Sequence, residues 1–173
     1  MIKVFVSVGT HEVSFDRLCT LAKKLDLPKY EVVVQQGPNE KVIFPKNYVV
    51  HDYLNFDEMK KYSNWCDVLV SQASPGLIKL AWQSDALSIS MPRRKDLGEH
   101  VDNHQFDFAE FIAKMFSTVI INENTNLGQV IDSVVEERDF RIQAQQKTLK
   151  LFEKKTQEMR LFAKSIVDDL IKF

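Results

Sequence analysis

Cysteine is scarce in this chain, since Cys19 and Cys66 are the only two among 173 residues. Both stand among apolar neighbours, and no CxxC pair is present. These features predict buried free thiols in a reducing compartment.

Glycine is also scarce, and none of the five glycines belongs to a GxGxxG fingerprint, which argues against binding of NAD or FAD. A formal net charge of -1 means that neither sign of charge dominates. A general binder of nucleic acids or anionic membranes normally has a strong basic excess, so only a local basic patch is compatible with this composition.

Long apolar runs are missing as well. The N-terminal run 4–8 is shorter than the core of a signal peptide, and no later segment approaches the roughly 20 apolar residues of a membrane span. We therefore expect a cytoplasmic protein whose contact with a membrane is peripheral or made through a partner.

Apolar, β-branched runs alternate with helix-period segments along most of the chain. The expected strands are residues 2–8, 31–36, 47–51, 67–71, 86–91 and 118–121. The expected helices are residues 14–25, capped by Ser14 and closed by Leu27-Pro28, and residues 56–62, 75–83, 101–115 and 126–135. This alternation predicts an α/β fold with a Rossmann-like, doubly wound parallel sheet.

From about residue 139 the composition changes, because segment 139–173 lacks glycine and proline. Its apolar residues recur at steps of three, four and seven: Leu149, Phe152, Met159, Phe162, Ile166 and Leu170. We predict a Rossmann-like domain at 1–138 and an amphipathic helical extension at 139–173, as one long helix or two with a bend. The extension could pack on its own sheet. Alternatively, part of its apolar stripe could dock a second protein or a membrane, because about 35 helical residues span about 50 Å.

Four loops follow strands and are expected at one edge of the sheet, where ligands of such folds bind: 9–12, 36–38, 72–76 and 93–104. Gly9 could bring backbone N–H groups near a phosphate or could form a plain turn. Ser74 could cap a helix that starts at Pro75, or its loop could bind a phosphate. Arg93 and Arg94 could bind phosphate oxygens or a partner's carboxylate, or could remain solvated.

His100 and His104 stand four residues apart, which on a helix is the spacing of metal ligands. Glu99 beside them does not belong to an HExxH motif, and Asp102-Asn103 before a helix more naturally acts as a cap. We therefore predict no metal site. No Ser/His/Asp or Cys/His grouping indicates nucleophilic catalysis.

Three stretches, VSVGTHEVSFDRL, FDEMKKYSNWCDVLVSQASPG and MPRRKDLGEHVDNHQFDF, resemble the glycosyltransferase family 28 C-terminal domain, typified by MurG. The resemblance runs from residue 1 to about 111 and is greatest to the free-standing small subunits of bacterial capsule and exopolysaccharide glycosyltransferases. It implies one half of a GT-B fold that binds a UDP-sugar as substrate and needs no cofactor. It also implies a membrane-associated, acceptor-binding partner subunit that recruits the chain to the inner face of the cell membrane.

The resemblance, together with the loop analysis above, also indicates site residues. The expected donor-binding residues are Gly9, Thr10, Gln36, Gly37, Ser74, Gly76, Arg93, Arg94, Glu99, His100, Asp102, His104 and Gln105. The candidate catalytic base is His11 in the VGTHE loop, unless the partner supplies the base.

One loop departs from the family pattern. Where relatives have a histidine and glycines, as in SHGGPS, this chain has SQASPG, so that Gln72 replaces the histidine and Ala73 a glycine. Leu80 stands where relatives often place a glutamate that holds the ribose hydroxyls. Loss of such a charge-assisted hydrogen bond costs about 1.5–3 kcal/mol.

Two functions are compatible with these observations. The first is the donor-binding subunit of a heteromeric inverting glycosyltransferase, which transfers a hexose from a UDP-sugar to an undecaprenyl-diphosphate-linked acceptor. The second is a non-catalytic partner that stabilises or activates a glycosyltransferase while its own nucleotide site is degenerate. Binding of UDP distinguishes the two.

Overall fold

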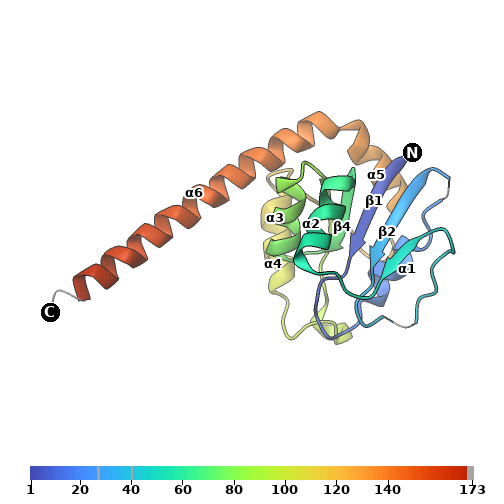
Figure 1. Ribbon diagram of the computed structural model, residues 1–173, viewed down its shortest axis with the longest axis horizontal. Helices are drawn as coiled ribbons and strands as arrows, with labels where there is room; N and C mark the ends of the chain where they lie inside the picture. Colours follow the sequence, from blue (N-terminus) through green and yellow to red (C-terminus); the bar gives the residue numbers. More distant parts are fainter. Residues whose placement is uncertain (27, 40, 171–173) are drawn as a thin grey trace.

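The computed structural model describes residues 1–26, 28–39 and 41–170, with side chains described up to Leu161. One parallel sheet has the strand order β3-β2-β1-β4-β5-β6 (Figure 1). The strands are β1 (Ile2–Ser7), β2 (Tyr30–Gln35), β3 (Val49–His51), β4 (Val68–Gln72), β5 (Leu87–Met91) and β6 (Val119–Ile120). The helices are α1 (Asp16–Ala22), α2 (Phe56–Trp65), α3 (Pro75–Gln83), α4 (His104–Ala113), α5 (Leu127–Glu136) and α6 (Arg138–Leu170), with a short 3-10 turn at Lys95–Leu97.

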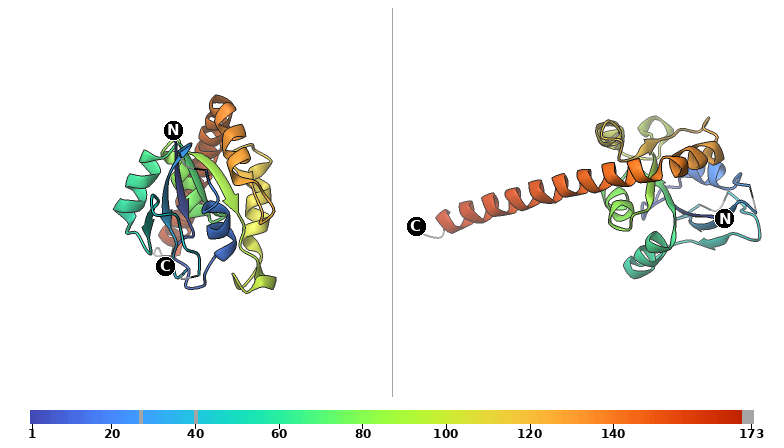
Figure 2. Two further views of the ribbon diagram at one scale, coloured as in Figure 1. Left: turned by 90° about the vertical axis from the view of Figure 1, so that its right-hand side faces the viewer. Right: turned by 90° about the horizontal axis from the view of Figure 1, so that it is seen from above.

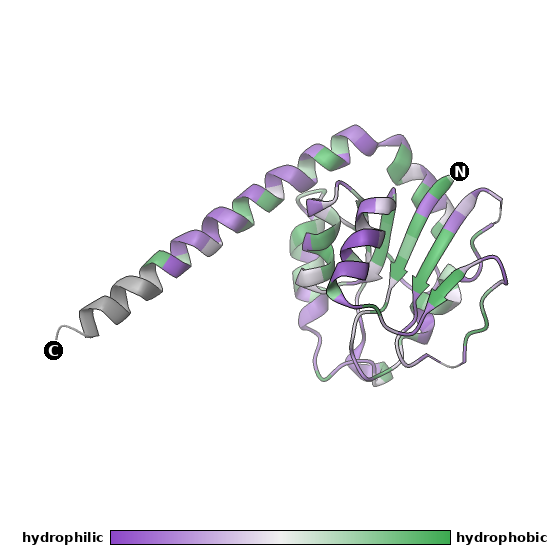
Figure 3. Ribbon diagram, in the orientation of Figure 1, coloured by the Kyte–Doolittle hydropathy of each residue, from purple (hydrophilic) through white to green (hydrophobic). Residues whose placement is uncertain are grey.

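Helices cover both faces of the sheet (Figure 2), and the strands between them consist largely of hydrophobic residues (Figure 3). Successive residues of a strand point to opposite faces. Val4 and Val6 therefore pack with residues of α1 and α5, whereas Phe5 packs with residues of α2 and α3. The strand order and the two helix layers confirm the predicted Rossmann-like, doubly wound fold.

The expected strands were placed correctly to within two residues, but the predicted cap of the first helix is wrong. Phe15, not Ser14, occupies the N-cap position of α1, and no side chain caps this helix. The carbonyls of Val13 and Ser14 instead accept hydrogen bonds from Arg93, so a tertiary contact holds the start of α1. The helix ends at Ala22, earlier than expected; Leu27 lies outside the described residues.

The fourth helix also begins later than expected, at His104 rather than at residue 101. The 3-10 turn before it ends at Gly98, whose φ of 69° turns the chain away from helical geometry. Asp102 Oδ1 accepts the N–H of His104 (3.1 Å), whereas the Asn103 side chain accepts the N–H of Lys95 (3.2 Å). Asn103 occupies the N-cap position without a side-chain cap bond, and Asp102, one residue before it, bonds the first helical N–H, so the predicted cap is present only in part.

The C-terminal segment is one continuous helix, α6, rather than two. Its first half packs on the domain, since Gln145 is buried and bonds backbone groups of Ser88 and Ala86. Phe152 packs against Trp82 with ring centroids 5.9 Å apart. Beyond this point α6 projects away from the domain (Figures 1 and 2).

The outer part of α6 is therefore available for other contacts, as Met159 is 64% exposed. The side chains of Phe162, Ile166 and Leu170, which belong to the predicted apolar stripe, lie outside the described residues. None of the helices in the described ranges is both long enough and apolar enough to cross a bilayer.

Both cysteines are buried free thiols, as predicted. Burial raises the pKa of the Cys19 thiol to about 11 and that of the Cys66 thiol to about 12. Neither thiol is therefore ionised near neutral pH, which excludes both as reactive nucleophiles.

Candidate functional site

The four predicted loops meet at one edge of the sheet, where β1, β2, β4 and β5 end. The strand order reverses direction between β1 and β4, and the crevice at such a switch point is where α/β sheets bind ligands. Contacts between the loops confirm that they are adjacent. Gln35 Nε2 donates to the carbonyl of Gly9 (2.9 Å), and Arg93 Nη2 donates to the carbonyl of Val8 (3.0 Å).

Gly9 has a specific steric reason to be glycine. Its φ of +76° is in the left-handed region, and a Cβ there would overlap Nε2 of Gln72 and lie 2.8 Å from Cδ. Its N–H bonds Ser7 Oγ (3.2 Å). The close approach of the β1 and β4 loops therefore depends on this glycine, so it does more than form a plain turn.

Substitution of Gly9 by alanine should lower the free energy of unfolding by about 1–3 kcal/mol. The added Cβ would strain the left-handed backbone and would clash with the Gln72 side chain, which a hydrogen bond from Arg93 holds in place. Gly76→Ala is the matched control. Added atoms there would meet only open space, and it should change stability by no more than about 1 kcal/mol, in the stabilising direction. Urea unfolding of both variants measures the difference, and equal stability of the two would contradict the steric role of Gly9.

The β2 loop is held against the end of β3. Gln36 and Gly37 donate their backbone N–H groups to the carbonyls of His51 and Asp52, both at 2.8 Å. The Gln36 side chain donates to Asp52 Oδ1 (2.8 Å). These bonds order the loop, and contact of Gln36 and Gly37 with a nucleotide base or ribose stays a prediction.

The SQASPG loop has the predicted structural cap. Ser74 Oγ accepts the N–H of Leu77 (3.4 Å), and Pro75 takes the first helical position. Gln72 is almost fully buried and accepts a hydrogen bond from Arg93 Nε at 2.5 Å. Gln72 is therefore part of a tight contact between β4 and the loop after β5.

Arg93 is completely buried. Besides Gln72, its guanidinium donates to the carbonyls of Val8 (3.0 Å), Val13 (2.9 Å) and Glu99 (3.2 Å). Burial lowers its pKa to about 10, which still leaves it charged at neutral pH. The Arg93 side chain therefore holds together the loops that follow β1, β4 and β5, and it does not extend toward a ligand.

Arg17 was not identified from the sequence, yet it makes the main ion pair of this edge. It binds Glu99 through two bonds, Nε to Oε1 (2.8 Å) and Nη2 to Oε2 (2.6 Å), and binds Glu123 Oε2 (2.7 Å). Although burial alone would lower it, the pKa of Arg17 is raised because these two carboxylates favour its charged form. Arg17 and Glu99 are 82 residues apart, so no local pattern could have paired them.

The donor-binding residues predicted after β5 thus divide into two groups. Glu99 and Gln105 are buried, and their oxygens are bonded to Arg17 and to the backbone N–H of Arg93 (3.1 Å). The Arg94 side chain is directed to Asp96 and Glu123. These residues support the loop, whereas Asp102 and His104 of the remaining group are open to solvent and His100 is partly buried.

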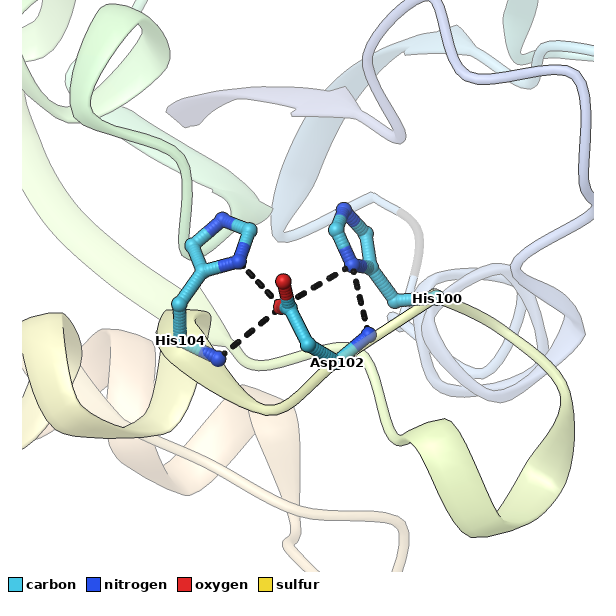
Figure 4. Close-up of side chains that lie close together, drawn as sticks. All are labelled: His100, Asp102 and His104. Carbon is cyan, nitrogen blue, oxygen red and sulfur yellow. Dashed lines mark hydrogen bonds and ion pairs between the residues drawn. The ribbon is translucent and has the colours of Figure 1, made fainter.

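That second group is His100, Asp102 and His104 (Figure 4). Asp102 Oδ1 lies 3.4 Å from Nδ1 of His100 and contacts Nδ1 of His104 directly. Hydrogen bonds and the charges of both imidazoles keep the pKa of the Asp102 carboxyl below its usual value. One ligand atom from each residue lies within 4.8 Å of the others, so among the described residues this set has the spacing to hold a metal ion. The expected helical spacing is wrong, however, because His100 lies in the loop before α4.

His11 joins this cluster, with its ring centroid 5.2 Å from that of His100. Burial, together with the charges of Arg93 and His100, lowers the pKa of His11, which favours the neutral imidazole. Its Nδ1 accepts the N–H of Val13 (3.1 Å), which places the proton of the neutral ring on Nε2. Held in this way, His11 presents a hydrogen-bond donor, which suits an anionic oxygen better than abstraction of a proton. The role of His11 as catalytic base stays a prediction.

The fold and the position of this edge define the class of protein: one Rossmann-like half of a GT-B glycosyltransferase fold. Two solved structures illustrate the fold. The glycotransferase of kitacinnamycin gives a TM-score of 0.63 at 17% identity, covering 88% of this chain and 43% of that one. Acinetobacter baumannii MurG gives a TM-score of 0.57 at 15% identity, covering 86% and 45%.

The chain belongs to the glycosyltransferase family 28 C-terminal domain family, whose model matches residues 3–166. Among curated relatives it is 25% identical over 169 residues to the UDP-N-acetylglucosamine–N-acetylmuramyl-(pentapeptide) pyrophosphoryl-undecaprenol N-acetylglucosamine transferase of Borreliella burgdorferi, covering 95% of this chain and 44% of the relative. The enzyme of the same description from Borrelia garinii subsp. bavariensis is 26% identical over 176 residues, covering 97% and 46%. The chain thus spans less than half the length of these relatives.

Proposed function

We propose that this chain binds a UDP-sugar at the carboxyl edge of its sheet, as the donor-binding subunit of a heteromeric inverting glycosyltransferase. One observation carries the proposal: three imidazoles, a carboxylate and the N-terminus of α4 converge beside the Gly9 loop at the switch point of the sheet. Imidazole N–H groups and a helix N-terminus suit a diphosphate, and a carboxylate suits sugar hydroxyls.

The reaction proposed is attack of an acceptor hydroxyl on the anomeric carbon, with inversion and departure of UDP. His11 and His104 would donate hydrogen bonds to the diphosphate as negative charge develops on it. Since Nδ1 of His11 is occupied, a base on the partner would take the proton of the acceptor hydroxyl. No cofactor or metal takes part in this scheme.

The partner proposed is a membrane-associated subunit that binds an undecaprenyl-diphosphate-linked acceptor, as in capsule or exopolysaccharide synthesis. The transferases named above act, by their descriptions, on an undecaprenol-linked substrate. Such a partner would recruit the chain to the cytoplasmic face of the membrane. Resemblance to free-standing donor subunits supports this arrangement.

A second candidate function is a non-catalytic partner that activates another glycosyltransferase subunit. It is favoured by α3, whose sequence PGLIKLAWQ contains no carboxylate to hold a ribose, and by Gln72, whose side chain is bound to Arg93. In that case the edge would keep its fold without binding a nucleotide.

Calorimetric titration with UDP and UDP-hexoses tests the proposal. We expect binding by the chain, alone or with its partner, and about 10- to 100-fold weaker binding by His104→Ala, because a charge-assisted hydrogen bond to phosphate is lost. Asp107→Ala, at an exposed residue one turn further along α4, is the control and should bind like the unmodified chain. Absence of binding under both conditions would overturn the donor site and favour the second function.

A further inference from the structure

A groove of about 740 Å³ lies between the end of α4 and the first half of α6. The residues that line it include Lys114, Phe116, Phe140, Lys147 and Leu151. α4 starts at the candidate donor edge, and its ten residues place the groove about 15 Å from that edge. A ligand in the groove would leave the loop that contains His100 accessible.

Three large apolar side chains of the groove are exposed: Phe116 by 57%, Phe140 by 54% and Leu151 by 44%. The rings of Phe116 and Phe140 meet edge to face with centroids 5.5 Å apart. Phe116 has a φ of 57°, which is strained for a bulky residue. Exposed apolar side chains that gather in one groove, one of them held in a strained turn, are typical of a surface that contacts another apolar surface.

The charged side chains that line the groove itself are basic. Lys114 and Lys147 are exposed, and the lining includes no carboxylate. Carboxylates lie beyond this lining, at Glu136, Glu137 and Asp139. Of these, Glu137, the C-cap residue of α5, is paired with Arg141 at 2.6 Å. The bias continues along the chain, because residues 138–173 contain nine lysines and arginines against five carboxylates, whereas residues 1–137 contain 14 against 19.

We infer that this α4–α6 groove binds the surface of a bilayer that contains anionic lipids. Phe116, Phe140 and Leu151 would insert at the boundary between acyl chains and headgroups, while Lys114 and Lys147 would pair with headgroup phosphates. A basic amphipathic helix on an acidic domain is typical of such peripheral contact. The inference deepens the proposed function by naming the surface that contacts lipid, and rests on that proposal for its biological purpose.

Co-sedimentation of the full chain with vesicles tests this inference. We expect binding to vesicles of phosphatidylcholine with about one third phosphatidylglycerol, weakening as salt is added, and little binding to pure phosphatidylcholine. Lys114→Gln with Lys147→Gln should weaken binding about 30-fold, since each lysine near an anionic surface contributes about a fivefold factor. Phe116→Asn should also weaken binding, and asparagine tolerates the positive φ, so the turn is kept.

The matched control is Lys46→Gln with Lys60→Gln, two exposed lysines outside the groove, which should bind vesicles about twofold less tightly at most. Thermal unfolding followed by circular dichroism shows that each variant is folded. The inference is overturned if the chain ignores anionic vesicles, or if the groove and control variants bind equally. It is also overturned if vesicle binding requires an added acceptor subunit, because the groove would then bind that protein and not lipid. UDP titration without vesicles reports on the donor site separately.

Discussion

Arg93→Met should lower the free energy of unfolding by about 3–5 kcal/mol, the largest loss expected for any single substitution at the site. The side chain is completely buried, and its removal leaves the carbonyls of Val8, Val13 and Glu99 without their donor inside the protein. An unsatisfied buried polar group costs about 1–3 kcal/mol, and several are created at once. Urea unfolding at neutral pH, where Arg93 is charged, measures the loss.

Arg93→Lys is the informative companion, because it keeps the charge and loses the forked geometry. A lysine has one nitrogen and cannot reach Gln72 on one side and the carbonyl of Val8 on the other, as the guanidinium does. We expect it to recover less than half of the stability lost in Arg93→Met. Full recovery by lysine would show that charge alone is needed, and would contradict the role assigned here to the guanidinium fork.

Arg17→Met should destabilise the protein by about 2–4 kcal/mol, because it leaves Glu99 charged and nearly buried without its bidentate partner. Glu99 would keep only the N–H of Arg94, at 2.9 Å from Oε2. The double variant Arg17→Met with Glu99→Leu should regain most of the loss, since replacing a buried pair with apolar groups is often neutral. A double-mutant cycle by chemical unfolding gives the coupling directly.

Lys29→Met provides the control for this cycle. Its ion pair with Asp132 is short, at 2.5 Å, but the lysine side chain is 51% exposed. Exposed pairs contribute about 0–1 kcal/mol, so the loss should stay within that range. If Lys29→Met were as damaging as Arg17→Met, burial would not be what makes the Arg17–Glu99 pair strong.

Much of the fold could be predicted because its signals are local. The apolar runs of 2–8, 67–71 and 86–91 identify strands wherever they occur in the chain, and Ser74-Pro75 marks the start of α3 within a few residues. Parallel strands then require all four loops to lie at one edge. The neighbourhood of the site therefore followed from strand boundaries alone.

The roles of individual residues at that edge could not be predicted in the same way. Arg93 and Arg94 are adjacent and chemically identical, yet one is completely buried and the other faces Asp96 and Glu123 at the surface. A glutamate in a polar loop is expected to be exposed, but Glu99 is buried and paired with Arg17 of α1. Burial and charge pairing depend on which segments pack together, and no short segment of the sequence contains that information.

The same division applies to the chain as a whole. Composition and periodicity are local properties, and they were enough to predict the α/β class, the two unpaired thiols, the edge where loops gather and the presence of a long C-terminal helix. Long-range packing sets the rest: the arginines after β5 support the loops, His11 joins His100 and His104, and α6 packs with its first half and projects with its second. These outcomes depend on contacts between segments tens of residues apart, where burial and electrostatics outweigh local preference.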